Sequence, residues 1–261
     1  MRVVRKRFGQ HFLHDANVIA RIVAAIAPLP SDALVEIGPG AAALTAPLLA
    51  ACGELDAIEI DRDLAAELHT RFATQPGFRL HVANALKMDW AALAATRGRK
   101  LRIVGNLPYN ISTPLLFRLI EQAPVIFDMH FMLQKEVVDR IVAAPNTDAY
   151  GRLGVMLAPH VTATRVLEVG AGAFTPPPKV RSAVVRLVVQ PSPPDWGTVP
   201  AFASVVAAAF GQRRKTLRNA LSNLLTAAQI EAAGIDPGAR AETLAPAQFG
   251  ALALAVGSVF H

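Results

Sequence analysis

The sequence predicts an α/β protein with a doubly wound, mostly parallel sheet, followed by a small all-helical domain. Two observations carry this prediction. Short apolar runs that read as buried strands alternate with helical patterns up to about residue 145. After the linker prolines Pro191, Pro193 and Pro194, only helical patterns remain. We therefore expect one domain at residues 1–189 and a second at residues 190–261.

The expected strands are short apolar runs of the kind that a parallel sheet buries on both faces. In chain order they are Ala33–Ile37, Leu55–Ile60, Phe78–Val82, Leu101–Val104, Ile126–Leu133, Val161–Val169 and Ala183–Val189. No long helix separates the last two runs, so we expect them to form an antiparallel end of the sheet.

Helices are expected between and after these strands. Asp15 can cap the first helix, in which apolar residues recur at helical spacing until Pro28 ends it. The other expected helices are Ala41–Ala51, Leu64–Phe72, Val199–Phe210, Arg213–Leu225, Ala227–Ala233 and Ala247–Val259.

Composition limits the class of protein. The 261 residues are 52% hydrophobic, and the net charge of +6 suits a polyanionic partner. Cys52 is the only cysteine, which excludes intrachain disulfides and cysteine-based metal sites, and no metal is expected. No apolar run reaches the roughly 18 residues of a membrane helix, and no signal-peptide core follows the basic start. We therefore expect a cytoplasmic protein without membrane contact, and a monomer.

The most informative motif is the tetrapeptide Asn106-Leu107-Pro108-Tyr109, between a predicted strand and the helix-start signal at Ser112. Ligands of open α/β sheets bind at this carboxyl edge. An amide oxygen and a backbone carbonyl can accept both hydrogens of an amino group on a planar ring, while the tyrosine covers the ring face. The motif therefore predicts a catalytic site that presents the exocyclic amine of a nucleobase to an electrophile.

A second motif predicts a cofactor site. The first strand leads into Gly38 and Gly40, and Ala43 completes a G-x-G-x-x-A spacing that allows a ligand to approach the backbone. Glu59 ends the second strand about 20 residues later, where an acid typically holds ribose hydroxyls. These features fit a nicotinamide cofactor as well as S-adenosylmethionine.

Two neighbouring residues favour S-adenosylmethionine. Pro39 removes a backbone donor that a pyrophosphate would use. Glu36 adds a negative charge, which suits a sulfonium cation better than a phosphate. At the end of the third strand, Asn84 could bind an adenine amine and a ring nitrogen, although an ordinary turn asparagine explains this position nearly as well.

Taken together, these segments resemble the ribosomal RNA adenine dimethyltransferases, and specifically the bacterial branch that acts on small-subunit (16S) RNA. The resemblance extends over nearly the whole chain. The matching segments are Arg7–Leu13, Val35–Gly40, Gly105–Pro114, Met132–Val137, Phe174–Val180 and Gln212–Asn219.

The resemblance implies a class I methyltransferase domain of Rossmann-like fold with a helical RNA-binding domain. It implies that two methyl groups from S-adenosylmethionine are placed on each of two adjacent adenosines, in a hairpin near the 3′ end of the RNA, during ribosome biogenesis. Phe174 would cover the second face of the base, although core burial is the stronger explanation for that residue taken alone. The residues implied at or beside the cofactor are His11, Leu13, Gly38, Glu59, Asn84 and Asn106.

One departure from the family pattern concerns the adenine. The family usually has aspartate where this chain has Asn84, and an amide can still accept from the adenine amine. His11 stands where some relatives have asparagine, and both side chains can form hydrogen bonds.

Basic residues near both ends of the chain are expected to contact the phosphates of the small-subunit RNA in an immature subunit. One group is an N-terminal arm without an acid before Asp15, and the other is a flank of the helix expected at Arg213–Leu225. The residues are Arg5, Lys6, Arg7, Arg213, Arg214, Lys215 and Arg218.

Four rival functions stay open at this point. A non-catalytic subunit-assembly factor would keep the fold, but the intact Asn106–Tyr109 motif argues against lost activity. A dimethyltransferase for large-subunit RNA shares this motif, whereas the basic segment Gln212–Asn219 favours the small-subunit branch. The basic flanks disfavour a methyltransferase for protein amides. A nicotinamide dehydrogenase is the weakest rival, because no hydride-transfer acid or base is evident.

Overall fold

The computed structural model describes residues 11–212 and 214–257. These residues form two compact units. One unit contains the described residues up to 138 together with 164–189, and the other contains 139–163 together with the described residues from 190 onward. The predicted boundary near 190 coincides with one point of division, but the segment 139–163 belongs with the helical unit.

The first unit is built on a seven-stranded sheet with the order β4-β3-β2-β5-β6-β9-β7. The strands are β2 (Ala33–Ile37), β3 (Leu55–Glu59), β4 (Phe78–Val82), β5 (Leu101–Asn106), β6 (Ile126–Gln134), β7 (Val161–Val169) and β9 (Ser182–Val189). The pairs from β4 to β6 are parallel, whereas β9 runs antiparallel to β6. This arrangement confirms the predicted doubly wound, mostly parallel sheet.

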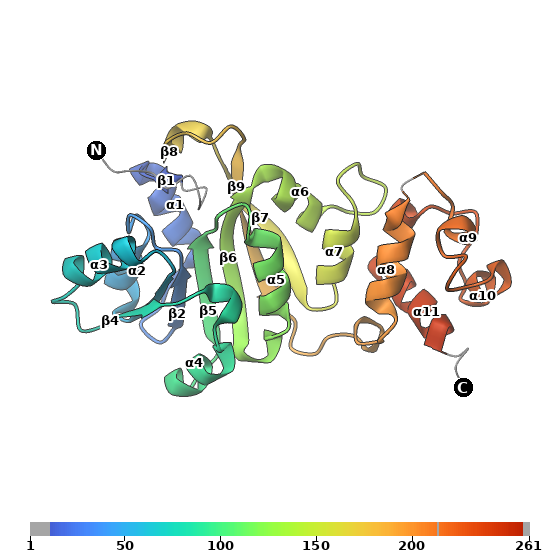
Figure 1. Cartoon of the computed structure of the whole chain (residues 1–261), viewed down its shortest axis with the longest axis horizontal. Helices are drawn as coiled ribbons and strands as arrows, with labels where there is room; N and C mark the ends of the chain where they lie inside the picture. Colours follow the sequence, from blue (N-terminus) through green and yellow to red (C-terminus); the bar gives the residue numbers. More distant parts are fainter. Residues whose placement is uncertain (1–10, 213, 258–261) are drawn as a thin grey trace. The chain divides into compact units, whose positions relative to one another are not determined.

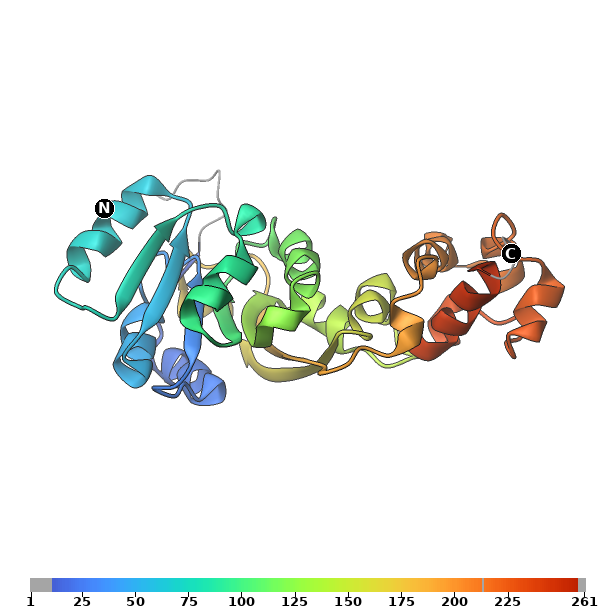
Figure 2. The same ribbon diagram turned by 90° about the horizontal axis from the view of Figure 1, so that it is seen from below.

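Helices lie on both sides of this sheet (Figures 1 and 2). They are α1 (Ala16–Ile26), α2 (Thr45–Cys52), α3 (Arg62–Arg71), α4 (Trp90–Arg97), α5 (Ser112–Ile120) and α6 (Lys135–Val142), the last of which crosses into the second unit. The side chains of α1, α2 and α3 share one core cluster with Leu34, Val104 and Met132 of the strands. As predicted, the Asp15 side chain caps α1 by accepting from the N–H groups of Asn17 and Val18.

The strand order reverses between β2 and β5, because β3 and β4 follow on one side of β2 while β5 and β6 follow on the other. Such a switch point opens a crevice at the carboxyl ends of the strands, where ligands bind. The glycine segment after β2 and the Asn106–Tyr109 corner, which begins at the last residue of β5, both lie at this edge.

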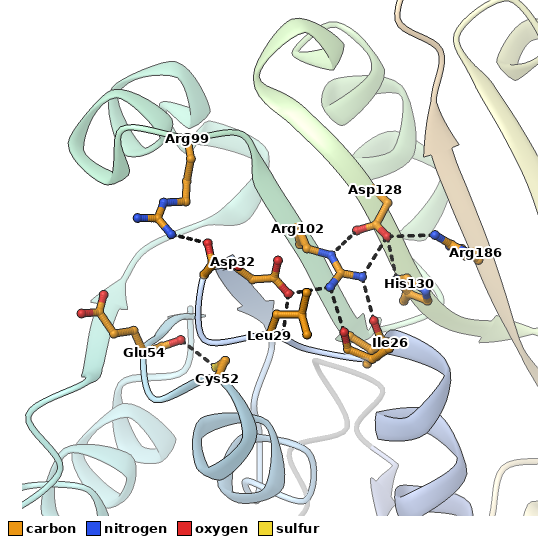
Figure 3. A network of polar contacts seen from close by, with 12 residues as sticks. Ile26, Leu29, Asp32, Cys52, Glu54, Arg99, Arg102, Asp128, His130 and Arg186 are labelled. Atoms are coloured by element: carbon orange, nitrogen blue, oxygen red, sulfur yellow. Dashed lines mark hydrogen bonds and ion pairs between the residues drawn. The ribbon is translucent and has the colours of Figure 1, made fainter.

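A buried ion network stabilises the sheet at its other edge (Figure 3). Arg102, near the start of β5, donates to both carboxylate oxygens of Asp128 at 2.9 and 3.0 Å and to Asp32 at 2.6 Å. The same guanidinium donates to the backbone carbonyl of Ile26, at the end of α1. Arg186 reaches Asp128 from β9 at 3.6 Å. This network ties α1 and the loop before β2 to β5, β6 and β9, and no sequence pattern predicted it.

A two-stranded sheet was not predicted either. β1 (Phe12–Leu13) pairs antiparallel with β8 (Phe174–Thr175), so residues about 160 apart in the sequence lie side by side (Figure 1). This pairing brings the N-terminal segment from His11 onward to the carboxyl edge of the main sheet. Strands of two residues carry too little alternation to be predicted from sequence.

Two predicted helices are shorter in the structure. The helix expected at Ala41–Ala51 begins at Thr45, because Gly40 and Ala42 have positive φ angles of 54° and 64°, which interrupt a right-handed helix. The helix expected at Arg213–Leu225 is only α9 (Leu217–Ala220). Its first backbone N–H groups, at Leu217 and Arg218, donate to carbonyls of residues 239 and 237 and so fix its start.

The second unit is helical in its described part after Val189, as predicted. Its helices are α7 (Arg152–Leu157), α8 (Phe202–Gly211), α9, α10 (Ala227–Ala232) and α11 (Pro246–Gly257), and short 3₁₀ turns lie at Asp195–Gly197 and Ala241–Thr243. Tyr150 and Val155 of the segment 139–163 pack in the same core as Phe249 of α11. The Tyr150 hydroxyl also donates to the carbonyl of Leu244 at 2.7 Å. These contacts explain why this segment joins the helical unit.

Candidate active site

A cavity of about 280 Å³ lies at the carboxyl edge of the main sheet. Such a volume approaches the lower end of the range for small-ligand pockets. The walls come from the segment before α1, the glycine loop after β2, the ends of β3 and β4, and the corner after β5. Ten of the predicted site residues line it, namely His11, Leu13, Gly38, Gly40, Glu59, Asn84, Asn106, Leu107, Pro108 and Tyr109.

The glycine loop forms one wall by a close approach of backbone to the cavity. Gly38 and Gly40 have φ angles of 67° and 54°, in the left-handed region that favours glycine. The N–H of Gly38 donates to the carbonyl of Ile58 at 2.9 Å, which ties the loop to β3. A Cβ atom at neighbouring Gly105 would lie 2.5 Å from the Ile37 carbonyl oxygen, so β5 also requires glycine beside this loop.

Two buried carboxyl groups face the cavity from the ends of β2 and β3. Glu36 is 2% exposed, and its Oε2 has no hydrogen-bond partner in the described part of the chain. Burial raises the pKa of Glu36 to about 7; the nearby Thr45 hydroxyl acts in the opposite direction, and the charge of Glu59 adds to the rise. Burial also raises the pKa of Glu59.

Glu59 is held by backbone donors. Its two carboxylate oxygens accept from Asp61 N at 2.9 Å and from Gly40 N at 3.3 Å. Each oxygen keeps a further lone pair, so the carboxylate can still accept from the hydroxyls of a ligand. The link to Gly40 also fixes the acid against the glycine loop.

Asn84 lines the cavity but uses its side-chain oxygen locally. The Oδ1 atom accepts from Leu86 N at 3.0 Å and so caps a 3₁₀ turn at Ala85–Lys87. The side-chain amide keeps its donors and one oxygen lone pair for a ligand. The structure therefore shows a turn residue that also lines the cavity, and a contact between Asn84 and an adenine stays a prediction.

The Asn106 side chain is held at the corner with its oxygen available. Its Nδ2 donates to the carbonyl of His11 at 3.2 Å, which leaves Oδ1 as an acceptor at the cavity. The backbone N–H of Leu107 donates to Met132 O at 3.2 Å, and within the described residues no hydrogen bond uses the Leu107 carbonyl. The two residues that the sequence predicted to supply acceptors for an amino group thus both line the cavity.

Tyr109 is fixed from two sides. Its hydroxyl hydrogen-bonds the Ser182 hydroxyl at 2.9 Å, and its ring stacks on His11 with centroids 5.9 Å apart. His11 is itself held, because its Nδ1 donates to the Pro176 carbonyl at 2.8 Å. Sequence reasoning missed Ser182 and Pro176, although Pro176 belongs to the matching segment Phe174–Val180 and Ser182 lies two residues after it.

The structure does not bring Phe174 to the cavity. Its side chain is 3% exposed and packs in the core cluster with Leu13 and Ala173, as part of the β1–β8 pair. Core burial, the stronger explanation from the sequence, is what the structure shows. A place for Phe174 over a bound base stays a prediction.

The predicted RNA-binding residues are only partly described. Arg214, Lys215 and Arg218 are exposed in the second unit, the first two in a turn and the third in α9. Arg5, Lys6, Arg7 and Arg213 lie outside the described residues.

Comparison with known proteins agrees with this geometry. Residues 1–256 match the family model for ribosomal RNA adenine dimethylases. The chain belongs to this family. The methyltransferase is 58% identical over 247 residues to the "Ribosomal RNA small subunit methyltransferase A" of Methylococcus capsulatus, covering 95% of each chain. It is 55% identical over 249 residues to the protein of the same name from Acinetobacter baylyi, covering 95% of this chain and 90% of the relative.

Solved structures support the fold of the methyltransferase. A dimethyladenosine transferase from Plasmodium falciparum matches with a TM-score of 0.81 at 23% identity, over 95% of this chain and 98% of the other. The 23S rRNA methyltransferase ErmE matches with a TM-score of 0.72 at 26% identity, over 94% and 99% of the two chains. The predicted class I fold is therefore confirmed.

The cavity fits the cofactor that the sequence predicted. A buried carboxyl oxygen without a partner, on Glu36, suits a ligand with positive charge. A carboxylate at the second strand end suits ribose hydroxyls, and the glycine loop admits a ligand close to the backbone. Within the described residues, no cluster of three or more histidine, cysteine or acidic side chains could hold a metal ion, and no helix is long and apolar enough to cross a membrane.

Proposed function

We propose that this methyltransferase transfers methyl groups from S-adenosylmethionine to the exocyclic amines of two adjacent adenosines near the 3′ end of small-subunit ribosomal RNA. The observation that carries this proposal is the Asn106–Tyr109 corner. Asn106, Leu107 and Tyr109 line the cavity together, and they would offer an amide oxygen, a backbone carbonyl and an aromatic ring to a bound base. The two relatives above, at 58% and 55% identity, are named for the small-subunit RNA.

Three groups of this chain would hold the cofactor. Glu59 would accept from the ribose hydroxyls, Asn84 would contact the adenine, and Glu36 would lie near the sulfonium. When bound, S-adenosylmethionine supplies an electrophilic methyl group. The protein's task is therefore to position a weak nucleophile, since the lone pair of an adenine amine is delocalised into its ring.

Asn106 and Leu107 would prepare that nucleophile. Hydrogen bonds from the amine to Asn106 Oδ1 and to the Leu107 carbonyl favour a localised lone pair that points away from both acceptors. Because Asn106 Nδ2 is held by His11 O, the amide cannot turn to present its donors instead. Positioning of this kind can be worth roughly 7–11 kcal/mol of the barrier.

Tyr109 would stack on the target base after the base leaves its helix. Extrusion of a base costs a few kcal/mol, and stacking on an aromatic ring returns about 1–3 kcal/mol. The Ser182 and His11 contacts fix the ring before the RNA arrives. No general base is required, because the methylated ammonium is acidic and loses its proton readily.

The partner we propose is the small-subunit RNA within an immature subunit, bound by a cytoplasmic monomer. The exposed residues Arg214, Lys215 and Arg218 support phosphate contacts by the second unit. The intact corner favours an enzyme over a non-catalytic assembly factor.

Labelled S-adenosylmethionine tests the function directly. We expect label in adenosines of small-subunit RNA when unmodified small subunits are offered, and none when large subunits are offered. Label confined to large-subunit RNA would contradict the proposal and favour the rival reaction. Mapping the modified bases would show whether two adjacent adenosines each receive two methyl groups.

A further inference from the structure

Three basic side chains converge on one carboxylate beside the catalytic corner. Glu168, near the end of β7, contacts Lys135 Nζ at 3.6 Å, Arg165 at 3.2 Å and Arg181 at 3.1 Å. We call these four residues the Glu168 cluster. All of them belong to the first unit.

The cluster is joined to Tyr109 by the backbone. Arg181 immediately precedes Ser182, whose hydroxyl hydrogen-bonds Tyr109 at 2.9 Å. Lys135 N donates to the Arg181 carbonyl at 2.9 Å, so the backbones of these two cluster members are in contact. Consecutive Cα atoms are about 3.8 Å apart. Arg181 is therefore the direct neighbour of Ser182, the residue that holds the Tyr109 ring.

The ion pairs of the cluster do little for folding. The Arg181 side chain is 64% exposed and that of Glu168 is 30% exposed. Exposed ion pairs contribute little to stability, because water screens the charges. Their clearer effect is to orient a guanidinium, which has five N–H donors and uses few of them on one carboxylate. An oriented arginine at the surface is the group best suited to bind phosphate through two hydrogen bonds.

The adjacent residues extend the same surface. Lys179 is exposed two residues before Arg181, and Val180 between them is 45% exposed. Neither side chain is needed by the core. The segment Lys179–Arg181 therefore presents charge and apolar surface to solvent directly before the buried Ser182.

We propose that the Glu168 cluster binds a backbone phosphate of the RNA strand next to the nucleotide whose base stacks on Tyr109. This inference rests on the proposed function, since it assigns a further part of the same substrate. A base that is extruded into the cavity carries its own sugar and phosphates to the rim. A phosphate held there fixes the nucleotide at both ends, with its base on the ring and its backbone on Arg181.

The test compares Arg181→Gln with the matched control Arg118→Gln. Arg118 also forms an exposed ion pair, with Glu121 at 2.7 Å on α5, and its side chain is 40% exposed. The affinity of both variants and of the unaltered protein for a single-stranded RNA of the target sequence is measured over a series of salt concentrations. A plot of log K against log salt has a negative slope, and the loss of one phosphate contact makes it less steep by about 0.7 for a single strand.

We expect this less steep slope, and a several-fold weaker affinity for RNA at low salt, for Arg181→Gln only. Arg181→Lys should keep the slope, because a lysine retains the charge. The Km for RNA should rise in Arg181→Gln, while kcat and the affinity for S-adenosylmethionine stay unchanged. Equal slopes for Arg181→Gln and Arg118→Gln would overturn the phosphate site.

The same experiment separates the two proposals. If the unaltered protein methylates small-subunit RNA but the Arg181→Gln slope is normal, only the phosphate site is wrong. If the unaltered protein transfers no methyl group to RNA, the proposed function fails, whatever the slope.

Discussion

Replacing Glu36 by glutamine should stabilise the cofactor-free protein, and increasingly so as the pH rises. The carboxyl is 2% exposed, Oε2 has no partner in the described residues, and burial raises its pKa from 4.5 to about 7. The folded state therefore keeps a proton that the unfolded chain loses above pH 4.5. For such a group, stability is present below the unfolded pKa and is lost as the pH rises through the folded pKa.

The size of the effect follows from the shift. A shift of about 2.5 pKa units corresponds to roughly 3 kcal/mol at about 1.4 kcal/mol per unit. The linkage relation, applied with the unfolded pKa of 4.5 and the folded pKa of about 7, gives the change over a range of pH. Between pH 5 and pH 8, the free energy of unfolding of the wild type should fall by about 2.5 kcal/mol relative to that of Glu36→Gln. Glutamine has nearly the same shape as glutamate and does not titrate, so any cost of packing it is the same at every pH.

Urea denaturation of both proteins without cofactor, at several pH values from 5 to 8, measures this difference. A constant difference across that range would contradict this prediction, because it would show that Glu36 does not titrate with a raised pKa in the folded state. Calorimetry adds a second readout. The variant should bind S-adenosylmethionine more weakly, while the neutral S-adenosylhomocysteine should lose less affinity, since the lost charge interacts with a cation.

Three further predictions concern packing, pH and the catalytic ring. Gly105→Ala should destabilise the first unit by about 1–3 kcal/mol in denaturant, because its Cβ would lie 2.5 Å from a carbonyl oxygen of β2, whereas Gly170→Ala, with open space around the Cβ, should have little effect. Burial lowers the pKa of His130 to about 4, so the free energy of unfolding should fall by about 2 kcal/mol as the pH falls from 7 to 5. The variant His130→Met should lack this part of the pH dependence. Tyr109→Phe and Ser182→Ala should each lower kcat about fivefold, as expected for the loss of one hydrogen bond of about 1 kcal/mol. The double variant should have the same kcat as either single variant. Additive losses would show that the two hydroxyls act separately.

The sign for His130 is opposite to that for Glu36. The ring is buried and neutral, with Asp128, 3.9 Å away, raising its pKa and Arg102 and Arg186 lowering it. The unfolded chain takes up a proton below about pH 6.5, but the folded protein does not until about pH 4. Stability from this residue is therefore present at neutral pH and lost on acidification.

The sheet could be predicted from sequence because its strands are short, continuous apolar runs. Ala33–Ile37 and Phe78–Val82 begin and end as predicted. Local chemistry also placed the Asp15 cap and the corner at Asn106. In each case the deciding interactions lie within a few residues of one another.

The failures depend on contacts between distant segments. The start of α9 is fixed by carbonyls at residues 237 and 239, which no helical spacing reveals. The pairing of β1 with β8 depends on residues about 160 positions apart. The membership of segment 139–163 in the helical unit rests on Tyr150 and its contact with Leu244.

The sequence predicted which residues line the cavity but not the contacts that hold them in place. Asn106, Tyr109 and Glu59 stand at the cavity as expected. The groups that hold them include backbone atoms, such as the His11 carbonyl that accepts from Asn106, and the Pro176 carbonyl in turn holds His11. Every residue carries such a carbonyl, so sequence gives no sign of which ones are used.

Methyl transfer by Asn106→Ala, measured with labelled S-adenosylmethionine and unmodified small subunits, tests the role of the Asn106 oxygen most directly. We expect a loss of kcat of at least about 100-fold, the scale for removing one group that stabilises a transition state, while calorimetry finds cofactor affinity largely retained. Turnover near that of the unaltered protein would contradict the role of the Asn106 oxygen, and with it the mechanism proposed for this corner.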